Sequence, residues 1–242
     1  MAQTPRGVVV DPRKLVVGSL VAAVGVLVLG FFLWMVPTAA ARESRAACAG
    51  MVSQPPLNPA LCPGGGPCTY PIPAPDFVAY DNNNKPVHLS DFRGKVVLLN
   101  FWASWCNVCK LEKPHLEDMA KDMAGKDFVV IALASDRSWA DVLVAIVDAL
   151  APNVKIPGKD VTLADALKAY QQGLPKGTAF QVLLDPPAGD DNIGQIAASW
   201  GIKAVPESAL IDRQGNIRHY FVNKRDWQTP VAETCLRSVI DE

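Results

Sequence analysis

Apolar and polar positions divide the chain into three regions. Residues 15–36 form a stretch of 22 residues without a charged side chain, and residues 37–75 are rich in proline. From residue 76 onward, short apolar runs alternate with stretches in which apolar residues recur every three or four positions. The short runs are typical of buried strands and the longer stretches of helices. Residues 76–242 are therefore predicted to form one α/β domain.

The alternating pattern predicts the order of the elements in this domain. Strands are expected at residues 77–79, 86–88, 96–99, 127–134, 181–184, 207–211 and 217–221, the last two as a hairpin. Helices are expected at residues 106–123, 138–150, 162–171, 192–200 and 226–240. Strands that alternate with helices in this way predict a central sheet covered by helices on both faces.

The uncharged stretch near the N-terminus is long enough to cross a hydrocarbon core of about 30 Å as a helix. Arg13 and Lys14 directly precede it, which predicts that residues 1–14 are cytoplasmic and that the rest of the chain lies outside. A cleaved signal peptide is the alternative, since Ala39-Ala40-Ala41 could provide a cleavage site. Cleavable apolar segments are usually shorter, so a membrane anchor at residues 15–36 is the favoured interpretation.

Residues 37–75 contain many of the 20 prolines of the chain. Proline disfavours helices and sheets and favours extended polyproline geometry. This region is therefore expected to be an extracytoplasmic stalk that holds the domain away from the membrane. The six cysteines of the chain also fit an extracytoplasmic protein better than a cytosolic one.

Four cysteines lie outside the central motif described below. Cys62 and Cys68 flank a glycine-rich loop and could form a structural disulfide, or a second redox pair that relays electrons to Cys106. Cys48 would then pair with Cys235 or remain free. Four cysteines allow three pairings, and the sequence does not choose between them.

Cys106 and Cys109 lie where the apolar run 96–99 gives way to a helical pattern. The N-terminus of a helix stabilises an anion, so Cys106 is predicted to be a solvent-facing nucleophilic thiolate. Cys109, one turn into the helix, is predicted to be buried and to resolve a mixed disulfide. The alternatives for Cys106 and Cys109 are a structural disulfide and one half of a zinc site.

No second pair of cysteines, and no cysteine–histidine pair, lies at the spacing of a zinc site. His88, His115 and His219 are scattered over different predicted elements and are interpreted as ordinary surface histidines. The prediction is therefore a redox-active disulfide between Cys106 and Cys109, with no metal and no other cofactor.

The segment WASWCNVCK at residues 102–110 resembles the active-site motif of the thioredoxin superfamily. Glu112 and Pro114, which follow it, resemble the membrane-anchored TlpA/ResA branch. The segments WGIKAVP at residues 200–206 and ALIDRQGNI at residues 209–217 resemble the family's cis-proline loop and hairpin. The resemblance extends from about Pro73 to the C-terminus and implies a thioredoxin fold with thiol–disulfide oxidoreductase activity.

The resemblance also implies roles for residues near the dithiol. A carboxylate at Glu112 can take the proton of Cys109 when this thiol is activated. Asn100 departs from soluble thioredoxin, which has a buried acid at this position, and an amide cannot act as a base. The alternative for Glu112 is a solvated helix acid paired with Lys113 or His115.

The residues implied in substrate binding are Trp105, Val205 and Pro206. Pro206 is expected to be the cis proline that faces the dithiol, and Val205 to offer its backbone to an extended substrate segment. Trp105 is expected beside the dithiol. Glu207 departs from the threonine common in the family. Residues 153–177 exceed the family's core and are interpreted as an insertion.

The resemblance implies a bacterial inner-membrane protein with one span, whose domain faces the periplasm or the cell exterior. It would reduce disulfides of exported proteins, such as the cysteines of apocytochrome c, with electrons from a membrane-bound thiol donor. The dipeptide Asn107-Val108 matches neither typical reductants nor strong oxidants, so the direction stays open. A net charge of −1 without a basic block argues against nucleic acid as a partner.

Three other functions are alternatives. A Sco-like copper chaperone usually has a CxxxC pair and a distant histidine, whereas the spacing here is CxxC. A peroxidase of the peroxiredoxin type has a threonine ahead of a lone cysteine, which is missing here. A redox-inert docking domain would have no need of an intact dithiol.

Overall fold

The structure is a computed structural model that describes residues 12–51, 59–62, 64, 66, 68–123, 125–150 and 180–242. The chain divides into two compact units, Met1–Ser44 and Arg45–Glu242. The helix predicted at residues 162–171 and the insertion predicted at residues 153–177 lie outside the described residues.

The first unit contains most of helix α1, Pro12–Met51. Its segment Leu15–Val36 has a mean hydropathy of 2.6. Among the described residues, this is the one segment long and apolar enough to cross a membrane, a criterion that a signal sequence also meets. The apolar N-terminal helix expected from the sequence is therefore present.

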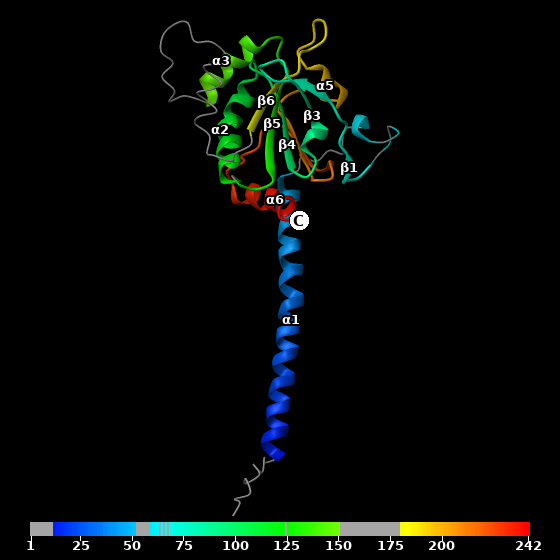
Figure 1. The fold of residues 1–242 in the computed structure, drawn as a ribbon, viewed down its shortest axis with the longest axis vertical. Helices are drawn as coiled ribbons and strands as arrows, with labels where there is room; N and C mark the ends of the chain where they lie inside the picture. Colours follow the sequence, from blue (N-terminus) through cyan, green and yellow to red (C-terminus); the bar gives the residue numbers. More distant parts are fainter. Residues whose placement is uncertain are drawn as a thin grey trace, which may run out of the picture. The chain divides into compact units, whose positions relative to one another are not determined.

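The second unit is built on an eight-stranded mixed sheet with the strand order β1-β8-β7-β4-β5-β6-β2-β3 (Figure 1). The strands are β1 (Ile72–Pro73), β2 (Val78–Tyr80), β3 (Pro86–His88), β4 (Val96–Trp102), β5 (Phe128–Ala134), β6 (Phe180–Leu184), β7 (Glu207–Ile211) and β8 (Asn216–Val222). The three neighbours β4, β5 and β6 run parallel, and the other pairs are antiparallel. Every residue of β4 and β5 is buried, which explains their continuous apolar runs.

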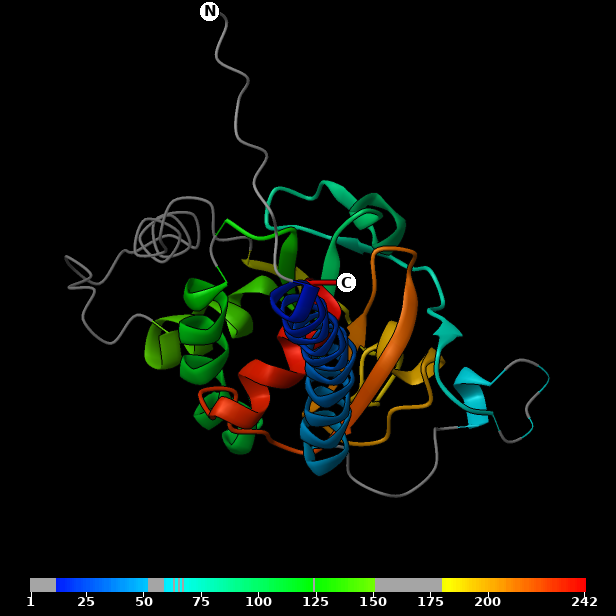
Figure 2. The same ribbon diagram turned by 90° about the horizontal axis from the view of Figure 1, so that it is seen from below.

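Helices cover both faces of this sheet. The main helices are α2 (Asn107–Asp122), α3 (Trp139–Leu150), α5 (Gln195–Ser199) and α6 (Pro230–Ile240), and two 3₁₀ turns are η1 (Pro59–Leu61) and η3 (Leu89–Phe92). Helices α2, α3 and α6 pack on one face in a first hydrophobic core, whereas α5, η1 and η3 pack on the other in a second core. Figure 2 shows α2 and α3 on one side of the sheet and α5 on the other. The predicted fold class, a mixed sheet between helices, is confirmed.

The described residues within 37–75 differ from the extended stalk that the proline content predicts. Helix α1 continues to Met51, because residues 38–50 contain no proline and six alanines, the strongest helix former. Farther along, Ile72–Pro73 pairs with β8 as an edge strand, where a residue without an N–H donor is tolerated. In the part of the chain that the structure describes, the folded domain therefore begins well before residue 76.

Helix α6 begins at Pro230 rather than at residue 226. Thr229 caps the helix, since its Oγ1 accepts a hydrogen bond from the backbone N–H of Ala232 at 3.2 Å. Proline at the first helical position suits this start, because the N–H that it lacks would have no partner inside the helix. The turn before the helix, which contains Arg225 and Trp227, is thus available for contacts with the site.

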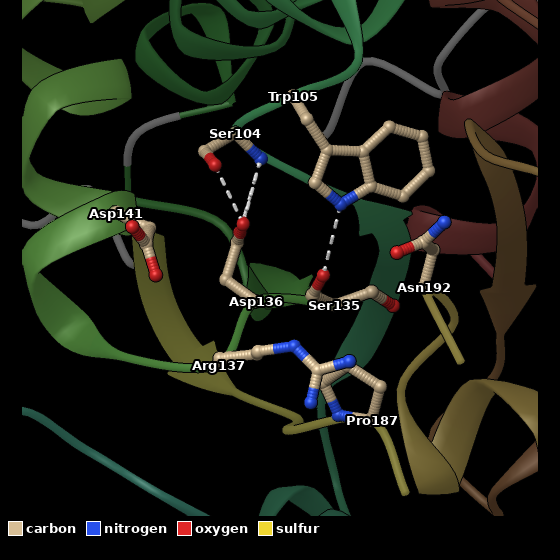
Figure 3. Close-up of a pocket in the computed structure, with 8 residues that line it drawn as sticks. All are labelled: Ser104, Trp105, Ser135, Asp136, Arg137, Asp141, Pro187 and Asn192. Atoms are coloured by element: carbon tan, nitrogen blue, oxygen red, sulfur yellow. Dashed lines mark hydrogen bonds between the residues drawn. The ribbon is translucent and has the colours of Figure 1, made fainter. Parts of the chain in front are cut away.

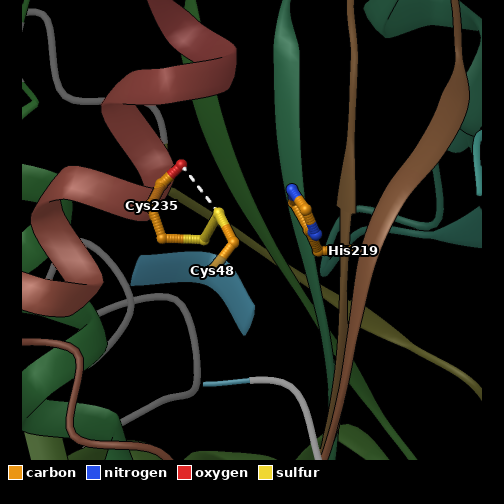
Figure 4. Close-up of side chains that lie close together, drawn as sticks. All are labelled: Cys48, His219 and Cys235. Carbon is orange, nitrogen blue, oxygen red and sulfur yellow. Dashed lines mark hydrogen bonds between the residues drawn. A yellow bond between two sulfur atoms is a disulfide. The ribbon is translucent and has the colours of Figure 1, made fainter. Parts of the chain in front are cut away.

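The four cysteines outside the motif form two disulfides, Cys62–Cys68 and Cys48–Cys235. The second joins the last turns of α1 to α6, with His219 of β8 beside it (Figure 4). Cys48, Cys235 and His219 have potential ligand atoms within 4.8 Å of one another. Both sulfurs are used in the disulfide, and metals bind thiolates, so this cluster is not a metal site in the oxidised state.

The two disulfides are expected to differ in their contribution to stability. They close loops with sequence separations of 187 and 6 residues. Because the loop entropy removed from the unfolded chain grows with loop length, Cys48→Ser/Cys235→Ser should lower the free energy of unfolding by roughly 2–5 kcal/mol. Cys62→Ser/Cys68→Ser is the matched control, with an expected loss of at most about 2 kcal/mol. Chemical denaturation of the full chain in detergent measures both, and equal losses would contradict the loop-length argument.

Candidate active site

The CxxC motif lies at the junction between β4 and α2. Strand β4 ends at Trp102, and Cys106 is the N-cap residue of α2. The Cys106 Sγ accepts a hydrogen bond from the backbone N–H of Cys109 at 3.1 Å. The two cysteines form a disulfide with a Cα–Cα distance of 5.2 Å. A sulfur in this position would keep the same N–H donor as a thiolate after reduction, and the helix dipole would also favour its negative charge.

Both sulfurs are more enclosed than the sequence suggests. Cys109 is fully buried, as expected, but Cys106 is only 7% exposed and not freely solvent-facing. The reason is the neighbouring cis-proline loop, whose Val205 carbonyl oxygen lies 3.6 Å from the Cys106 Sγ. Trp105, in contrast, is 51% exposed beside the dithiol. Among the described residues, the exposed Trp105 and the cis-proline loop are thus neighbours of Cys106.

The loop that faces the dithiol precedes β7. The Val205–Pro206 peptide bond is cis, as the motif indicated. The next residue, Glu207, stands where threonine is common in the family. Its carboxylate accepts a hydrogen bond from the Tyr220 hydroxyl at 2.6 Å, and burial raises the pKa of Glu207 above its usual value. The side chain of Glu207 is thus held by β8.

Glu112 is 1% exposed, which excludes the solvated helix acid considered from the sequence. Its Oε1 accepts hydrogen bonds from the backbone N–H of Arg225 and from the Trp227 indole N–H, both at 2.9 Å. Its Oε2 accepts a longer bond of 3.4 Å from the Asn100 amide. Burial raises the pKa of Glu112, and these hydrogen bonds lower it in part. Glu112 is therefore a buried acid one helical turn beyond Cys109.

Lys113 is a site residue that the sequence analysis missed as a buried group. It is 1% exposed, and its Nζ donates a hydrogen bond of 2.7 Å to the Asn100 Oδ1. The same Nζ lies 4.2 Å from the centre of the Trp102 ring. Burial lowers the pKa of the Lys113 ammonium, and the charge of Glu112 opposes this shift. A lysine next to a glutamate on an amphipathic helix is normally interpreted as a surface residue, so only the contacts of Lys113 in the folded protein reveal its burial.

His115 was the other partner considered for Glu112. It instead lies 3.0 Å from Asp226, through its Nδ1, at the protein surface. The three histidines lie on different elements, as the sequence indicated: β3 contains His88, α2 contains His115 and β8 contains His219.

A polar cavity of about 240 Å³ lies beside Trp105 (Figure 3). Asp136, one of the residues that line it, accepts hydrogen bonds from the Ser104 backbone N–H at 3.0 Å and from the Ser104 hydroxyl at 2.6 Å. Burial raises the pKa of Asp136, and both bonds from Ser104 lower it in part. The Trp105 indole N–H points to the Ser135 carbonyl at 3.4 Å. These contacts fix the loop immediately before Cys106, and the half-exposed Trp105 lines the cavity.

The strand order, the CxxC motif at a strand–helix junction and the cis proline opposite it define a thioredoxin-like fold. The family model described as Redoxin matches residues 72–236, more than half of the chain. The chain belongs to the Redoxin family.

Curated relatives carry the name Thiol-disulfide oxidoreductase ResA. The protein from Bacillus thuringiensis subsp. konkukian (strain 97-27) is 28% identical over 144 residues, which cover 60% of this chain and 64% of that protein. The protein from Bacillus subtilis (strain 168) is 26% identical over 144 residues, covering 60% of this chain and 62% of that protein. The chain thus matches somewhat less than two thirds of the length of these relatives. The resemblance to the ResA branch is confirmed.

Solved structures show the same fold. A thiol:disulfide interchange protein of the DsbE type from Chlorobium tepidum has a TM-score of 0.51 and 26% identity, covering 70% of this chain and 96% of that chain. The thioredoxin domain of a thiol-disulfide oxidoreductase from Bacteroides vulgatus has a TM-score of 0.50 and 23% identity, covering 71% of this chain and 99% of that chain. The second comparison supports the fold alone.

Proposed function

We propose that the protein is a membrane-anchored extracytoplasmic thiol–disulfide oxidoreductase that reduces disulfides of exported proteins. The observation that carries this proposal is the position of the Cys106 Sγ, which lies at the N-cap of α2, next to Val205 of the cis-proline loop. The similarity to proteins named Thiol-disulfide oxidoreductase ResA supports the same class of activity.

The reaction begins with both cysteines reduced. The Cys106 thiolate attacks one sulfur of a substrate disulfide, forms a mixed disulfide and releases the other substrate sulfur, which takes up a proton. Cys109 then passes its proton to Glu112, and its thiolate attacks the Cys106 sulfur of the mixed disulfide. The Cys106–Cys109 disulfide forms, and the second substrate sulfur leaves and is protonated. Two electrons move from the dithiol to the substrate, and a dithiol donor restores them.

The catalytic residues of this proposal are Cys106, Cys109 and Glu112. Val205 and Pro206 bind the substrate backbone as an extended segment, because the cis bond presents the Val205 carbonyl beside the Cys106 Sγ. Trp105 packs against substrate side chains on the other side of the dithiol, where half of its surface is exposed. The proposal needs no metal and no cofactor besides the redox disulfide.

The substrates are proposed to be exported proteins with accessible disulfides, for which the cysteine pair of apocytochrome c is one candidate. The family resemblance supports this class and the direction of electron flow, towards the substrate. A membrane-bound thiol protein would serve as the electron donor. The enclosed Cys106 agrees with such substrates, since an extended polypeptide can lie along the cis-proline loop.

Turnover of a protein disulfide tests the activity. The full chain in detergent should catalyse reduction of a protein disulfide such as that of insulin in the presence of a small dithiol donor. A rate no higher than that of the donor alone, measured with a correctly folded protein, would contradict the proposed function.

The location is proposed from the apolar segment Leu15–Val36 and the basic residues before it. Residues 1–14 would be cytoplasmic, residues 15–36 would form a single span of the bacterial inner membrane, and the domain would face the periplasm or the cell exterior. A reporter fused after Glu242 should be active only if it functions outside the cytoplasm. Activity of a cytoplasmic reporter at the same position would contradict this topology.

A further inference from the structure

A chain of polar contacts connects a buried cation to the buried acid of the site. Lys113 donates to the Asn100 Oδ1 at 2.7 Å, and the Asn100 amide donates to the Glu112 Oε2 at 3.4 Å and to the Ser208 hydroxyl at 3.0 Å. Asn100 lies in the centre of β4, and it is fully buried. Its carbonyl thus faces the lysine while its amide faces the glutamate, so Asn100 bridges the two charged groups.

A fully buried lysine has a large desolvation cost and is retained only where its charge is compensated. The compensation available to Lys113 consists of the Asn100 oxygen, the face of Trp102 and the carboxylate of Glu112. Replacing a whole buried ion pair by apolar side chains is often neutral or stabilising, whereas removing one partner leaves the other charge uncompensated. The buried lysine at position 113 is therefore tied to the neighbouring acid, Glu112.

We propose that Lys113 is a positioning residue for the resolving step: through Asn100, its ammonium holds Glu112 in the ionised form that accepts the Cys109 proton. This inference rests on the proposed function and extends it. A carboxylate that is buried without a cation tends to be protonated, and a protonated acid cannot accept another proton. Lys113 offsets this effect by its positive charge, and Asn100 conveys the contact by hydrogen bonds at both ends.

The other described groups that face the pair come from β4, α2, β7 and the segment between β8 and α6. Arg225, in the segment between β8 and α6, is the second cation near Glu112. The dithiol of Cys106 and Cys109 lies one to two turns earlier on α2. Ser208, Trp102 and Trp227 are the neutral neighbours among the described residues, and they do not titrate in the working range. In the described part of the chain, Lys113 and Arg225 are thus the cations coupled to Glu112, and Lys113 can be replaced without removing a hydrogen bond to Glu112.

The test compares Lys113→Met, Lys113→Gln and the control Lys121→Met in the full chain in detergent. Lys121 lies on the same helix and pairs with Glu117 and Asp118 at the surface. Lys113→Met and Lys113→Gln should shift the acid limb of the pH–rate profile for the resolving step upward by about one pH unit or more, since a nearby opposite charge lowers the pKa of a carboxyl group by about 1–3 units. Lys121→Met should leave the profile unchanged. In the Glu112→Gln background, Lys113→Met should cause no further shift.

The outcomes separate a positioning role from a structural one. A changed melting temperature with an unchanged pH profile would overturn the inference while leaving the proposed function intact. Inactivity of the wild-type chain would instead contradict the proposed function itself. If the Lys113 variants do not fold, the ¹⁵N signal of the Lys113 Nζ can be titrated in the wild type and in Glu112→Gln. Coupling is reciprocal, so loss of the Glu112 charge should lower the Lys113 midpoint, and identical midpoints would overturn the inference.

Discussion

Replacing Cys109 by serine is expected to stop the reaction after the first attack, whereas replacing Cys106 by serine should prevent that attack. Turnover should fall by at least about 10³-fold in either variant, because the two cysteines act as a unit and loss of one abolishes the cycle. Cys109→Ser keeps the Cys106 sulfur at the N-cap of α2. The backbone N–H of residue 109, which donates to this sulfur, is also kept. This variant should therefore accumulate a mixed disulfide with the substrate, which non-reducing electrophoresis measures, and Cys106→Ser should not.

The matched control is Cys62→Ser/Cys68→Ser. The Cys62–Cys68 disulfide closes a short loop and has no role in the proposed reaction. The control should retain turnover close to that of the wild type with a modest loss of stability. Collapse of its turnover at an unchanged melting temperature would support the alternative in which this pair relays electrons to Cys106.

Glu112→Gln is expected to slow the resolving step by about 10²–10⁴-fold at neutral pH, the usual contribution of a positioned base. The amide keeps the size of the side chain and can still accept hydrogen bonds from Arg225 and Trp227. It cannot take the proton of Cys109. Since Cys106 is activated separately by the N-terminus of α2, the first attack should be unaffected and the mixed disulfide should accumulate.

The rate of the resolving step should depend on pH differently in the wild type and in Glu112→Gln. Burial raises the pKa of Glu112, so in the wild type the resolving step should be slow at acidic pH and reach its plateau only after Glu112 is ionised. In Glu112→Gln this acid limb disappears, and the rate should rise with pH as Cys109 ionises without help. Glu233→Gln, on the exposed surface of α6, is the control and should change neither rate nor profile. Stopped-flow measurements from pH 5 to 9 decide the question, and a wild-type profile in Glu112→Gln would contradict the assignment.

Much of the fold follows from short-range patterns. The sequence predicts a hairpin of strands at residues 207–211 and 217–221, and the structure has β7 at the predicted residues, paired with β8. The apolar runs of β4 and β5 indicated central strands, and Cys106 fell within one residue of the start of α2. In each case, the information lies within about 20 residues of the sequence.

The features that sequence reasoning missed depend on distant partners. Lys113 and Glu112 occupy positions that look solvated on a helix, yet Asn100 lies in a strand and Trp227 lies 115 residues beyond Glu112. The proline-rich segment similarly contains Ile72–Pro73, which gains its partner only when β8 supplies an edge. The pairing of Cys48 with Cys235 spans 187 residues and could not be chosen from spacing. Proline content and polarity predict the conformation and exposure of a short segment. The contacts above form only when elements distant in the sequence come together in the folded domain.

The central claim is that Cys106 attacks the substrate and Cys109 resolves the mixed disulfide. Its most direct test is the site of attachment in the substrate adduct of full-length Cys109→Ser, mapped by proteolysis and mass spectrometry without reduction. We predict a substrate cysteine joined to Cys106, with the Cys62–Cys68 and Cys48–Cys235 disulfides intact. Attachment to Cys62 or Cys68, or attachment to Cys109 in the corresponding Cys106→Ser protein at an equal rate, would contradict the claim.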